Sequence, residues 1–274
     1  MAIITISREL AALGDETAQE LAKLLDYRFV DKRALEERIK SYGVMGSRLD
    51  KYDERKPSFW ASLSQDRDDY LHYLKTAMLD EAGQGNCVFI GRGANAVFRG
   101  FPGVISLFLV APTEVRLERV KSYFHCDEKR ARQIIDQSDH DRIGFHRYFF
   151  ESDWKDPANY HLSLNTGSLH PAICAQLIKN LWDRTITPEI EAQHIQRLKD
   201  LTLGQTVVHR ILYEKGIAIH FLEASVCEGS VTLFGVANSQ ALVEAALTVA
   251  REIDGVGDAH SDIQVVQEYS VLPQ

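Results

Sequence analysis

No stretch of the sequence is apolar for long enough to cross a membrane, and the cysteines form no motif. A spanning helix needs about 20 consecutive apolar residues, and no run among the 274 residues reaches that length. The start of the chain lacks the charged and apolar segments of a signal peptide. The four cysteines are scattered without CxxC spacing, which argues against a disulfide framework and a four-ligand zinc site. We therefore expect a cytoplasmic protein with reduced cysteines.

Positive charge is also scarce. The chain has 31 basic and 39 acidic residues, which gives a formal net charge of −8. This balance argues against general nucleic-acid binding, so we expect no nucleic-acid partner, although local arginine clusters can still bind phosphate groups. The hydrophobic content of 45% is ample for a packed core. The length suits one large domain with a small one attached, or two modest domains.

The beginning of the chain runs from a strand through a loop into a helix, but it lacks the glycines and the lysine of the phosphate-binding pattern GxxxxGK[ST]. The apolar run Ile3–Ile6 predicts a strand buried on both faces. Gly14 permits a tight turn, and Thr17 with Glu20 predicts a capping box that opens the helix. In a phosphate loop, backbone N–H groups at a helix N-terminus bind the anion. The layout of such a loop is therefore present although its usual residues are not.

Acidic side chains stand where phosphate would bind. Asp15 and Glu16 follow Gly14 directly. Two like charges about 4 Å apart repel each other by roughly 4 kcal/mol at an effective dielectric constant near 20. Carboxylates that point into the loop would weaken phosphate binding about a thousandfold, whereas carboxylates that point to solvent would have little effect.

Strand-like apolar runs alternate with helical segments over the first two thirds of the chain. Repeated crossover units of this kind predict an α/β fold with a doubly wound parallel sheet. The polar segment 44–70 predicts an irregular insertion over the sheet edge. The expected strands cover residues 3–6, 27–31, 87–90, 104–110 and 160–165, and the expected helices cover 32–41, 68–81, 127–150 and 171–182, with a further helix capped by Thr113.

Arg92 comes directly after the strand expected at 87–90. Open α/β sheets bind ligands beyond the carboxyl ends of their strands, so Arg92 is placed where a phosphate could be met. A surface arginine in a turn explains the same position equally well.

The helix expected at 127–150 is loaded with charge of both signs. Arg130, Arg132 and Arg142 alternate with acids such as Asp139. One interpretation is a solvated helix whose i,i+3 and i,i+4 ion pairs contribute only a few tenths of a kcal/mol each. The other is a lid that carries arginines, because guanidinium groups suit the oxygens of a phosphoryl group in transfer.

The last third of the chain has a different pattern. A polar segment at 184–200, with Pro188, predicts a linker. The expected elements after it are a helix at 196–213, strands at 217–226 and 230–236, a helix at 240–253 and a strand at 263–266. They predict a small α+β domain of about seventy residues.

Five motifs, in order, resemble the cytidylate kinase-like family of P-loop nucleoside monophosphate kinases. They are ITISREL with the following Gly14, VFIGRG at 88–93, FLVAPTEVRLERV at 108–120, DxxR at 139–142 and DWKDPANYHLSLNTG at 153–167. Near the end, EGSVTLFGVANSQ and AREIDGVGDAHSDIQVV resemble a BON domain. The resemblances imply a P-loop kinase-like domain with a helical lid at 1–184, a linker at 185–200 and a BON-like domain at 201–270.

The resemblance implies a role for each candidate residue. Where the family usually has the loop GSGG, this chain has Ala11, Ala12, Leu13 and Gly14, so two alanines and a leucine crowd the approach to phosphate. The donor nucleotide's phosphates would be held by the loop residues Arg8, Gly14, Asp15, Glu16 and Thr17. Arg92 would bind the phosphate of the acceptor nucleotide. The lid arginines would be Arg130, Arg132 and Arg142, and Asp139 would orient Arg142. The implied cofactors are ATP and Mg²⁺, with Thr17 as the metal ligand, although helix capping explains Thr17 as well.

Three hypotheses about function follow. The first is an enzyme that uses ATP to phosphorylate a pyrimidine monophosphate such as CMP. The second is a catalytically degenerate domain that binds a nucleotide or another phosphate compound and acts through the BON-like domain. The third is a structural protein that uses the kinase fold as a scaffold. BON domains are associated with lipid, other surfaces or protein partners, so we expect such a partner for the C-terminal region.

Overall fold

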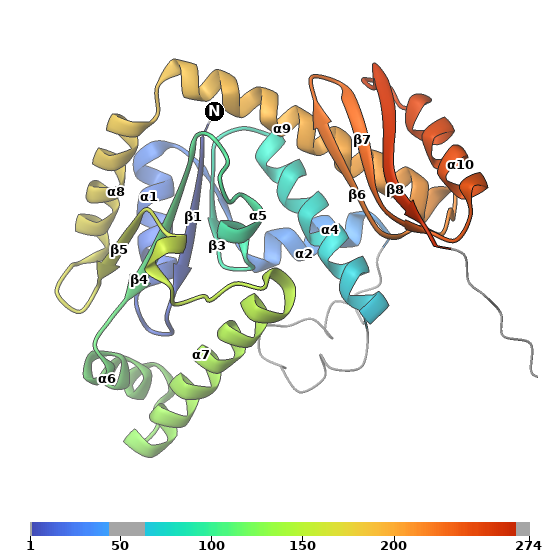
Figure 1. The fold of residues 1–274 in the computed structure, drawn as a ribbon. Coiled ribbons are helices and arrows are strands. Elements are labelled where there is room, and N and C mark those ends of the chain that lie inside the picture. The colour runs from blue at the N-terminus through green and yellow to red at the C-terminus, as the bar shows by residue number, and fades with distance from the viewer. Residues whose placement is uncertain (1, 44–63, 267–274) are drawn as a thin grey trace, which may run out of the picture. The chain divides into compact units, whose positions relative to one another are not determined.

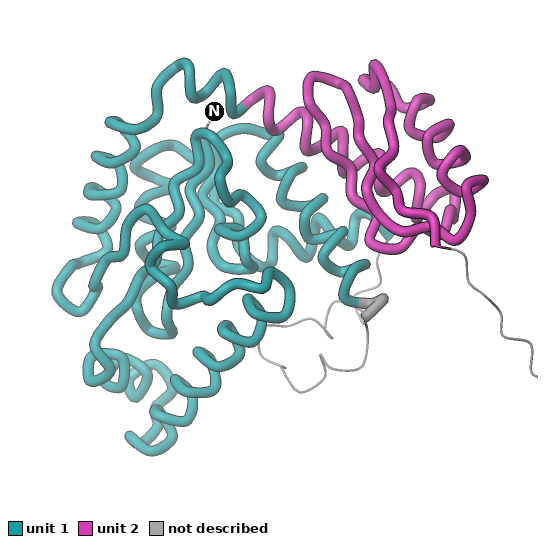
Figure 2. The backbone as a smooth tube through the Cα atoms, viewed as in Figure 1, with its two compact units in different colours: residues 1–194 teal, residues 195–274 magenta. Residues whose placement is uncertain are grey.

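A computed structural model describes residues 2–43 and 64–266, so the insertion expected at 44–70 lies mostly outside the described residues. The chain divides into two compact units, Met1–His194 and Ile195–Gln274 (Figure 2). Each unit is described on its own below. Among the described helices, none is both long and apolar enough to cross a membrane.

The strands of the first unit form one parallel sheet with β1 at its centre (Figure 1). The strand order is β2-β3-β1-β4-β5. Every residue of β1 from Ile3 to Ser7 is buried, as the apolar run at the start of the sequence predicts. The strands are β1 (Ile3–Arg8), β2 (Arg28–Val30), β3 (Cys87–Ile90), β4 (Val104–Val110) and β5 (Leu162–Asn165).

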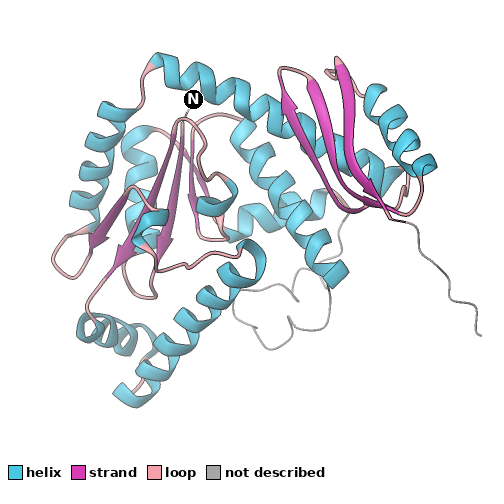
Figure 3. Ribbon diagram, viewed as in Figure 1, coloured by secondary structure: helices cyan, strands magenta, loops and turns pink. Residues whose placement is uncertain are grey.

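Helices cover both faces of this sheet (Figure 3). On one face, Ile4 and Ile6 of β1 share a buried cluster with Leu21 and Ile178, which belong to two helices. On the other face, Phe89 of β3 packs on Phe98, with ring centroids 5.4 Å apart. The helices are α1 (Gly14–Leu25), α2 (Lys32–Ser41), α4 (Ser64–Gly83), α5 (Ala94–Val97), α6 (Thr113–Phe124), α7 (Glu128–Phe150), α8 (Pro171–Thr185) and α9 (Pro188–His209). The predicted α/β fold is confirmed.

Helices α6 and α7 form a hairpin that packs against the loop after β1. Leu117 of α6 and Ile135 of α7 belong to one small buried cluster. Leu10 and Ala11 from the loop pack against the same cluster. The helical lid that the sequence predicts is therefore tied to the loop by apolar contacts.

The second unit has its own sheet and its own core. Its strands are β6 (His220–Cys227), β7 (Ser230–Ala237) and β8 (Asp258–Val265), and α10 (Gln240–Arg251) connects β7 to β8. Strands β6 and β7 are antiparallel and are joined by a tight turn at Glu228 and Gly229, both with positive φ. Strands β7 and β8 are parallel. The predicted small α+β domain is confirmed.

The boundary between the two units falls within helix α9. The division falls between His194 and Ile195, within the range 185–200 that the sequence predicts as a linker. From Pro188 onward this segment is helical. The ranges 1–184 and 201–270 stay predictions.

Candidate functional site

The loop between β1 and α1 keeps an unusual backbone without the glycines that favour it. Ala11 and Leu13 have φ angles of 61° and 50°, in the left-handed region. This conformation costs a residue with a side chain about 1–2 kcal/mol. The resemblance to the GSGG loop places glycine at both of these positions. Left-handed residues within a turn create a concave arrangement of N–H groups that binds anions. The backbone of such a loop is therefore present although its sequence has changed.

Three successive carbonyl groups of the loop are held by side chains from other elements. Arg116 Nε donates to Leu10 O at 2.7 Å, and Arg119 Nη1 donates to Ala11 O at 2.8 Å. Thr166 Oγ1 lies 3.0 Å from Ala12 O. These contacts turn the carbonyl oxygens toward α6 and the turn after β5.

The N–H groups at the start of α1 face no acceptor in the described part of the chain. Helix α1 begins at Gly14, and its N-cap residue Leu13 makes no side-chain capping bond. Within the described residues, the N–H groups of Leu13, Gly14, Asp15 and Glu16 make no hydrogen bond, and Thr17 N–H is the first to donate, to Leu13 O at 3.0 Å. Four open donors and the positive end of the helix dipole make this place suitable for an anion.

The two acidic residues beside the loop are turned outward. The side chain of Arg8 passes over Gly14, so that a Cβ atom added to Gly14 would lie 2.4 Å from Arg8 Cγ. Its guanidinium group lies 3.6 Å from the carboxylate of Asp15, whose side chain is 61% exposed. Glu16 is also exposed. The repulsion that inward-facing carboxylates would cause is therefore largely absent, and Gly14 leaves the room that Arg8 needs.

Thr17 does not fit the predicted role of metal ligand. Its side chain is fully buried, and its hydroxyl donates to Leu13 O at 2.7 Å. The predicted capping box with Glu20 is wrong, because the helix begins three residues before Thr17. No cluster of three or more metal-binding side chains occurs in residues 2–43 and 64–266.

Asp139 pairs with a buried arginine that the sequence did not single out. Both of its carboxylate oxygens accept from Arg116 Nη2, at 2.9 and 2.8 Å. Arg142 instead donates to the hydroxyl of Ser138 at 2.5 Å. The role of Asp139 in orienting Arg142 stays a prediction, since in this structure the carboxylate pairs with Arg116 of α6. Asp139 also accepts from Leu10 N–H at 3.4 Å, which links α7 to the loop.

Lys155 is a second cation beside the pair formed by Asp139 and Arg116. Lys155 Nζ lies 3.2 Å from Glu9 Oε1 and 3.8 Å from Asp139 Oδ2. Glu9 in turn lies 3.3 Å from Arg116 Nη1. Two carboxylates and two cations balance one another, and the Lys155 side chain remains 45% exposed beside the loop.

Aromatic packing fixes the segment that carries Lys155. Trp154 is buried against Phe108 of β4, with ring centroids 5.2 Å apart, and Tyr160 stacks on Phe108 at 4.9 Å. The hydroxyl of Tyr160 donates to Trp154 O at 2.7 Å. Burial raises the pKa of Tyr160 to about 12, so the phenol stays protonated and keeps this hydrogen bond.

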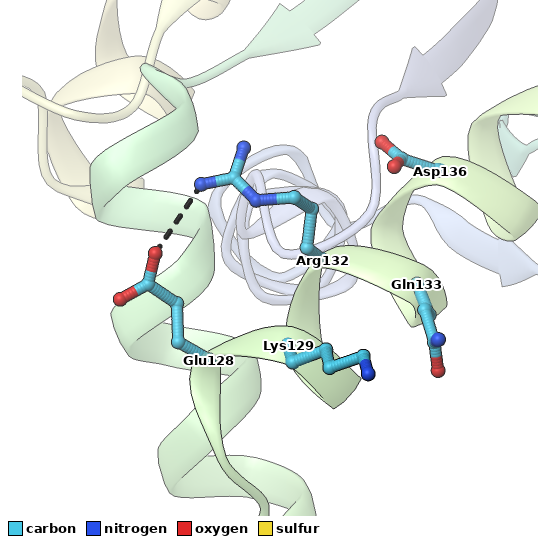
Figure 4. Close-up of a pocket in the computed structure, with 5 residues that line it drawn as sticks. All are labelled: Glu128, Lys129, Arg132, Gln133 and Asp136. Atoms are coloured by element: carbon cyan, nitrogen blue, oxygen red, sulfur yellow. Dashed lines mark hydrogen bonds and ion pairs between the residues drawn. The ribbon is translucent and has the colours of Figure 1, made fainter.

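The lid arginines do not converge on one point. Arg130 is exposed and lies near Gln133, whereas Arg132 pairs with Glu128 at 3.3 Å. Arg142 lies ten residues further along α7, about 15 Å at 1.5 Å per residue. Arg132 lines a hollow of about 460 Å³ on one face of α7, together with Glu128, Lys129, Gln133 and Asp136 (Figure 4).

Arg92 lies at the carboxyl edge of the sheet, as predicted, but it is buried and paired. Its exposed fraction is 3%, and Nη2 lies 3.0 Å from Glu36 Oε1. Nη1 donates to the hydroxyl of Tyr70 at 3.4 Å. The preceding Gly91 donates to Ile6 O, so the turn that carries Arg92 is fixed to the central strand. An acceptor phosphate would have to compete with Glu36 for this arginine.

The residues that shape the loop were missed by sequence reasoning. Arg116 and Arg119 fall within the motif at 108–120 and Thr166 falls within the motif at 153–167, but neither motif predicts a role for them. Each follows the carboxyl end of β4 or β5, the strands on one side of β1. The rule that ligands bind beyond these strand ends could have singled them out.

Two family matches and one solved structure agree with this architecture. Residues 3–168 match the cytidylate kinase-like family, and residues 199–267 match the BON domain. An uncharacterized protein from Eubacterium ventriosum has a similar fold, with a TM-score of 0.53 and 22% identity over 67% of this chain and 99% of that chain. A shikimate kinase from Bacteroides thetaiotaomicron aligns over 66% of this chain and 98% of that chain, with a TM-score of 0.41 and 16% identity. The comparison with curated proteins finds no match.

Proposed function

Since the chain belongs to the cytidylate kinase-like family and carries a BON domain, we propose that its first unit transfers the γ-phosphoryl group of ATP to a pyrimidine monophosphate such as CMP. The observation that carries this proposal is the loop after β1, whose left-handed residues Ala11 and Leu13 lead into the open N–H groups of residues 13–16, an arrangement that suits a phosphate chain. In the reaction, a phosphate oxygen of CMP attacks the γ-phosphorus of ATP. The bond from that phosphorus to the bridging oxygen breaks, and ADP leaves with the electron pair as CDP forms.

The chain's own groups have separate tasks in this proposal. The N–H groups of residues 13–16 and the guanidinium group of Arg8 bind the donor phosphates. Arg92 leaves Glu36 to bind the acceptor phosphate. The lid arginines Arg130, Arg132 and Arg142 approach the transferred group when helix α7 moves. Because Arg132 and Arg142 lie about 15 Å apart along this helix, they contact different parts of the bound nucleotides.

Magnesium supplies charge neutralisation when it is bound to ATP. We assign it no protein ligand, since the Thr17 hydroxyl is buried and bonded to Leu13 O. We place the activity in the cytoplasm, where ATP and CMP occur, and we assign a lipid, other surface or protein partner to the BON domain.

Incubation of the full-length protein with ATP, CMP and Mg²⁺, followed by chromatography of the nucleotides, tests the proposal. Equal amounts of ADP and CDP are expected. The variant Arg8→Met should lose most of this activity, whereas Arg184→Met, an exposed change on α8, should keep it. If no ADP and CDP form even at high enzyme concentration, the kinase proposal is excluded.

A second function is favoured by the hydroxyl of Thr17, which is buried and donates to Leu13 O. A loop that binds phosphate but offers no hydroxyl to a metal suits a domain that binds a nucleotide without turning it over and signals through the BON domain. Calorimetry with a panel of nucleotides separates these cases. Binding without turnover supports the second function, and no binding of any nucleotide leaves only the structural role.

A further inference from the structure

The loop after β1 adopts a backbone that its residues disfavour, and two side chains from outside the loop hold it in that shape. We propose that Arg119 and Thr166, together called the loop clamp, are positioning residues that allow a phosphate loop to work without its glycines. This inference rests on the proposed function, because the loop is the place where the donor phosphates bind. The clamp touches the loop backbone and not the substrate.

The clamp is a connected set of hydrogen bonds. Arg119 Nη1 donates to Ala11 O at 2.8 Å, while Nη2 of the same guanidinium group donates to Thr166 O at 2.7 Å. The Thr166 hydroxyl lies 3.0 Å from Ala12 O and 3.2 Å from Val110 O. Thr166 N–H donates to Val110 O at 2.8 Å, and Thr166 is 2% exposed. Thr166 is therefore anchored to β4 and shielded from water, whereas Arg119 is half-buried.

The geometry of the peptide group explains how the clamp aims the loop. In a trans peptide, the carbonyl oxygen and the N–H of the same unit point in opposite directions. The carbonyl of Ala12 is turned toward Thr166, so the N–H of Leu13 is turned away from it. That N–H has no acceptor in the described part of the chain and belongs to the open group at the start of α1. Holding the carbonyl of Ala12 thus presents the N–H of Leu13 to an anion, while the Ala11 carbonyl held by Arg119 fixes the neighbouring peptide, whose Ala12 N–H donates to Glu9 O at 3.3 Å.

The clamped carbonyl groups belong to the strained part of the loop. Ala11 and Leu13 carry the positive φ angles, and the clamp holds the carbonyl group of Ala11 itself and that of Ala12, which lies between the two strained residues. Strained backbone persists only where the surrounding structure determines it fully. With glycine at positions 11 and 13, the same backbone would need no such support. The clamp should therefore matter most in a loop that lacks glycine.

If the clamp supports a strained loop, removing it should matter less when the loop contains glycine. A hydrogen bond that only stabilises the fold would matter equally in both loops. Arg119→Met and Thr166→Val remove the donors while keeping the approximate shapes. Each is made in the natural loop and in the double variant Ala11→Gly, Leu13→Gly, with the full-length protein. Arg119→Lys, which retains one donor for Ala11 O, serves as the conservative variant, and Arg184→Met serves as the exposed control.

The first measurement is the dissociation constant of ATP by calorimetry, with the melting temperature recorded for each variant. Loss of a hydrogen bond from a charged donor predicts about tenfold weaker binding for Arg119→Met in the natural loop. In the glycine loop the expected loss is less than about threefold, and Arg119→Lys should recover part of the affinity. Equal losses in both loops, or no loss in either, would overturn the proposal.

The second measurement needs no ligand. Amide hydrogen exchange at Ala12 and Thr17, whose N–H groups donate to Glu9 O and Leu13 O, should become faster in Arg119→Met and Thr166→Val and should not change in Arg184→Met. If the natural protein binds no nucleotide, the proposed function fails, but this measurement still decides the clamp. Unchanged exchange in both clamp variants would then refute it.

Discussion

Ala11 and Ala12 are neighbours of the same type with different backbone conformations. Ala11 has a φ of 61°, whereas Ala12 has no positive φ and is fully buried. Glycine at position 11 relieves the left-handed strain, and this gain exceeds the added freedom of the unfolded chain. We expect Ala11→Gly to raise the free energy of unfolding by about 0.5 kcal/mol, as measured by urea denaturation.

Ala12→Gly is the matched control for this prediction. It adds the same freedom to the unfolded chain, relieves no strain and removes a buried methyl group, so it should lower the free energy of unfolding by about 1–2 kcal/mol. A similar loss of stability in both variants would show that the backbone at Ala11 is not strained.

Single residues also show why the site was only partly predictable. The position of Arg92 beyond a strand follows from sequence order, and this placement is what the structure has. The partner of Asp139 does not follow from sequence, because Arg116 lies 23 residues away and reaches it only once α6 and α7 have packed. The left-handed backbone at Leu13 could not be predicted from the sequence, because leucine disfavours that conformation.

At the scale of elements, the sequence predicted the buried strands of the first unit and helix α2 well, whereas strand β8, expected at 263–266, runs from Asp258 to Val265. The buried runs of β1, β3 and β4 are continuous and apolar, and their bounds follow from composition. Helix α1 was expected to open at Thr17 with a capping box, but it opens at Gly14 after a residue that makes no cap. The linker segment proved helical from Pro188, because helix α9 buries side chains such as His194 and Leu198 that a free linker would expose.

Helix α9 carries a buried histidine whose ionisation is linked to folding. His194 Nδ1 donates to Pro102 O at 2.7 Å, and its Nε2 is buried with no hydrogen-bond partner within the described residues. Burial lowers the pKa of His194, and the hydrogen bond to Pro102 offsets only part of this effect. The histidine is therefore neutral in the folded protein.

The pKa of His194 in the folded protein lies below the value of about 6.5 expected for the unfolded chain. The unfolded chain consequently binds a proton first, and the free energy of unfolding should fall as the pH drops below about 6.5. Melting temperatures from pH 8 to pH 5 test this. His194→Phe should flatten the decline, while His260→Gln, at a side chain that is 62% exposed, should not. A decline of the same slope in His194→Phe would contradict the prediction.

At the scale of the whole molecule, the two units have separate cores. The core of the first contains Leu107, and the core of the second contains Leu233; both side chains are fully buried. Residues 195–274, which form the second unit, contain no tryptophan in the sequence. Tryptophan fluorescence therefore follows the unfolding of the first unit alone, whereas circular dichroism follows both.

Leu233→Ala tests whether each core stabilises its own unit. Removal of a buried leucine side chain costs about 2–5 kcal/mol through lost burial and a residual cavity. If the cores are independent, urea denaturation of Leu233→Ala should show an earlier transition by circular dichroism and an unchanged midpoint by tryptophan fluorescence. Leu107→Ala, the matched change in the first unit, should lower the fluorescence midpoint. A lowered fluorescence midpoint in Leu233→Ala would instead show that the BON domain stabilises the kinase-like unit, because the two would then unfold together.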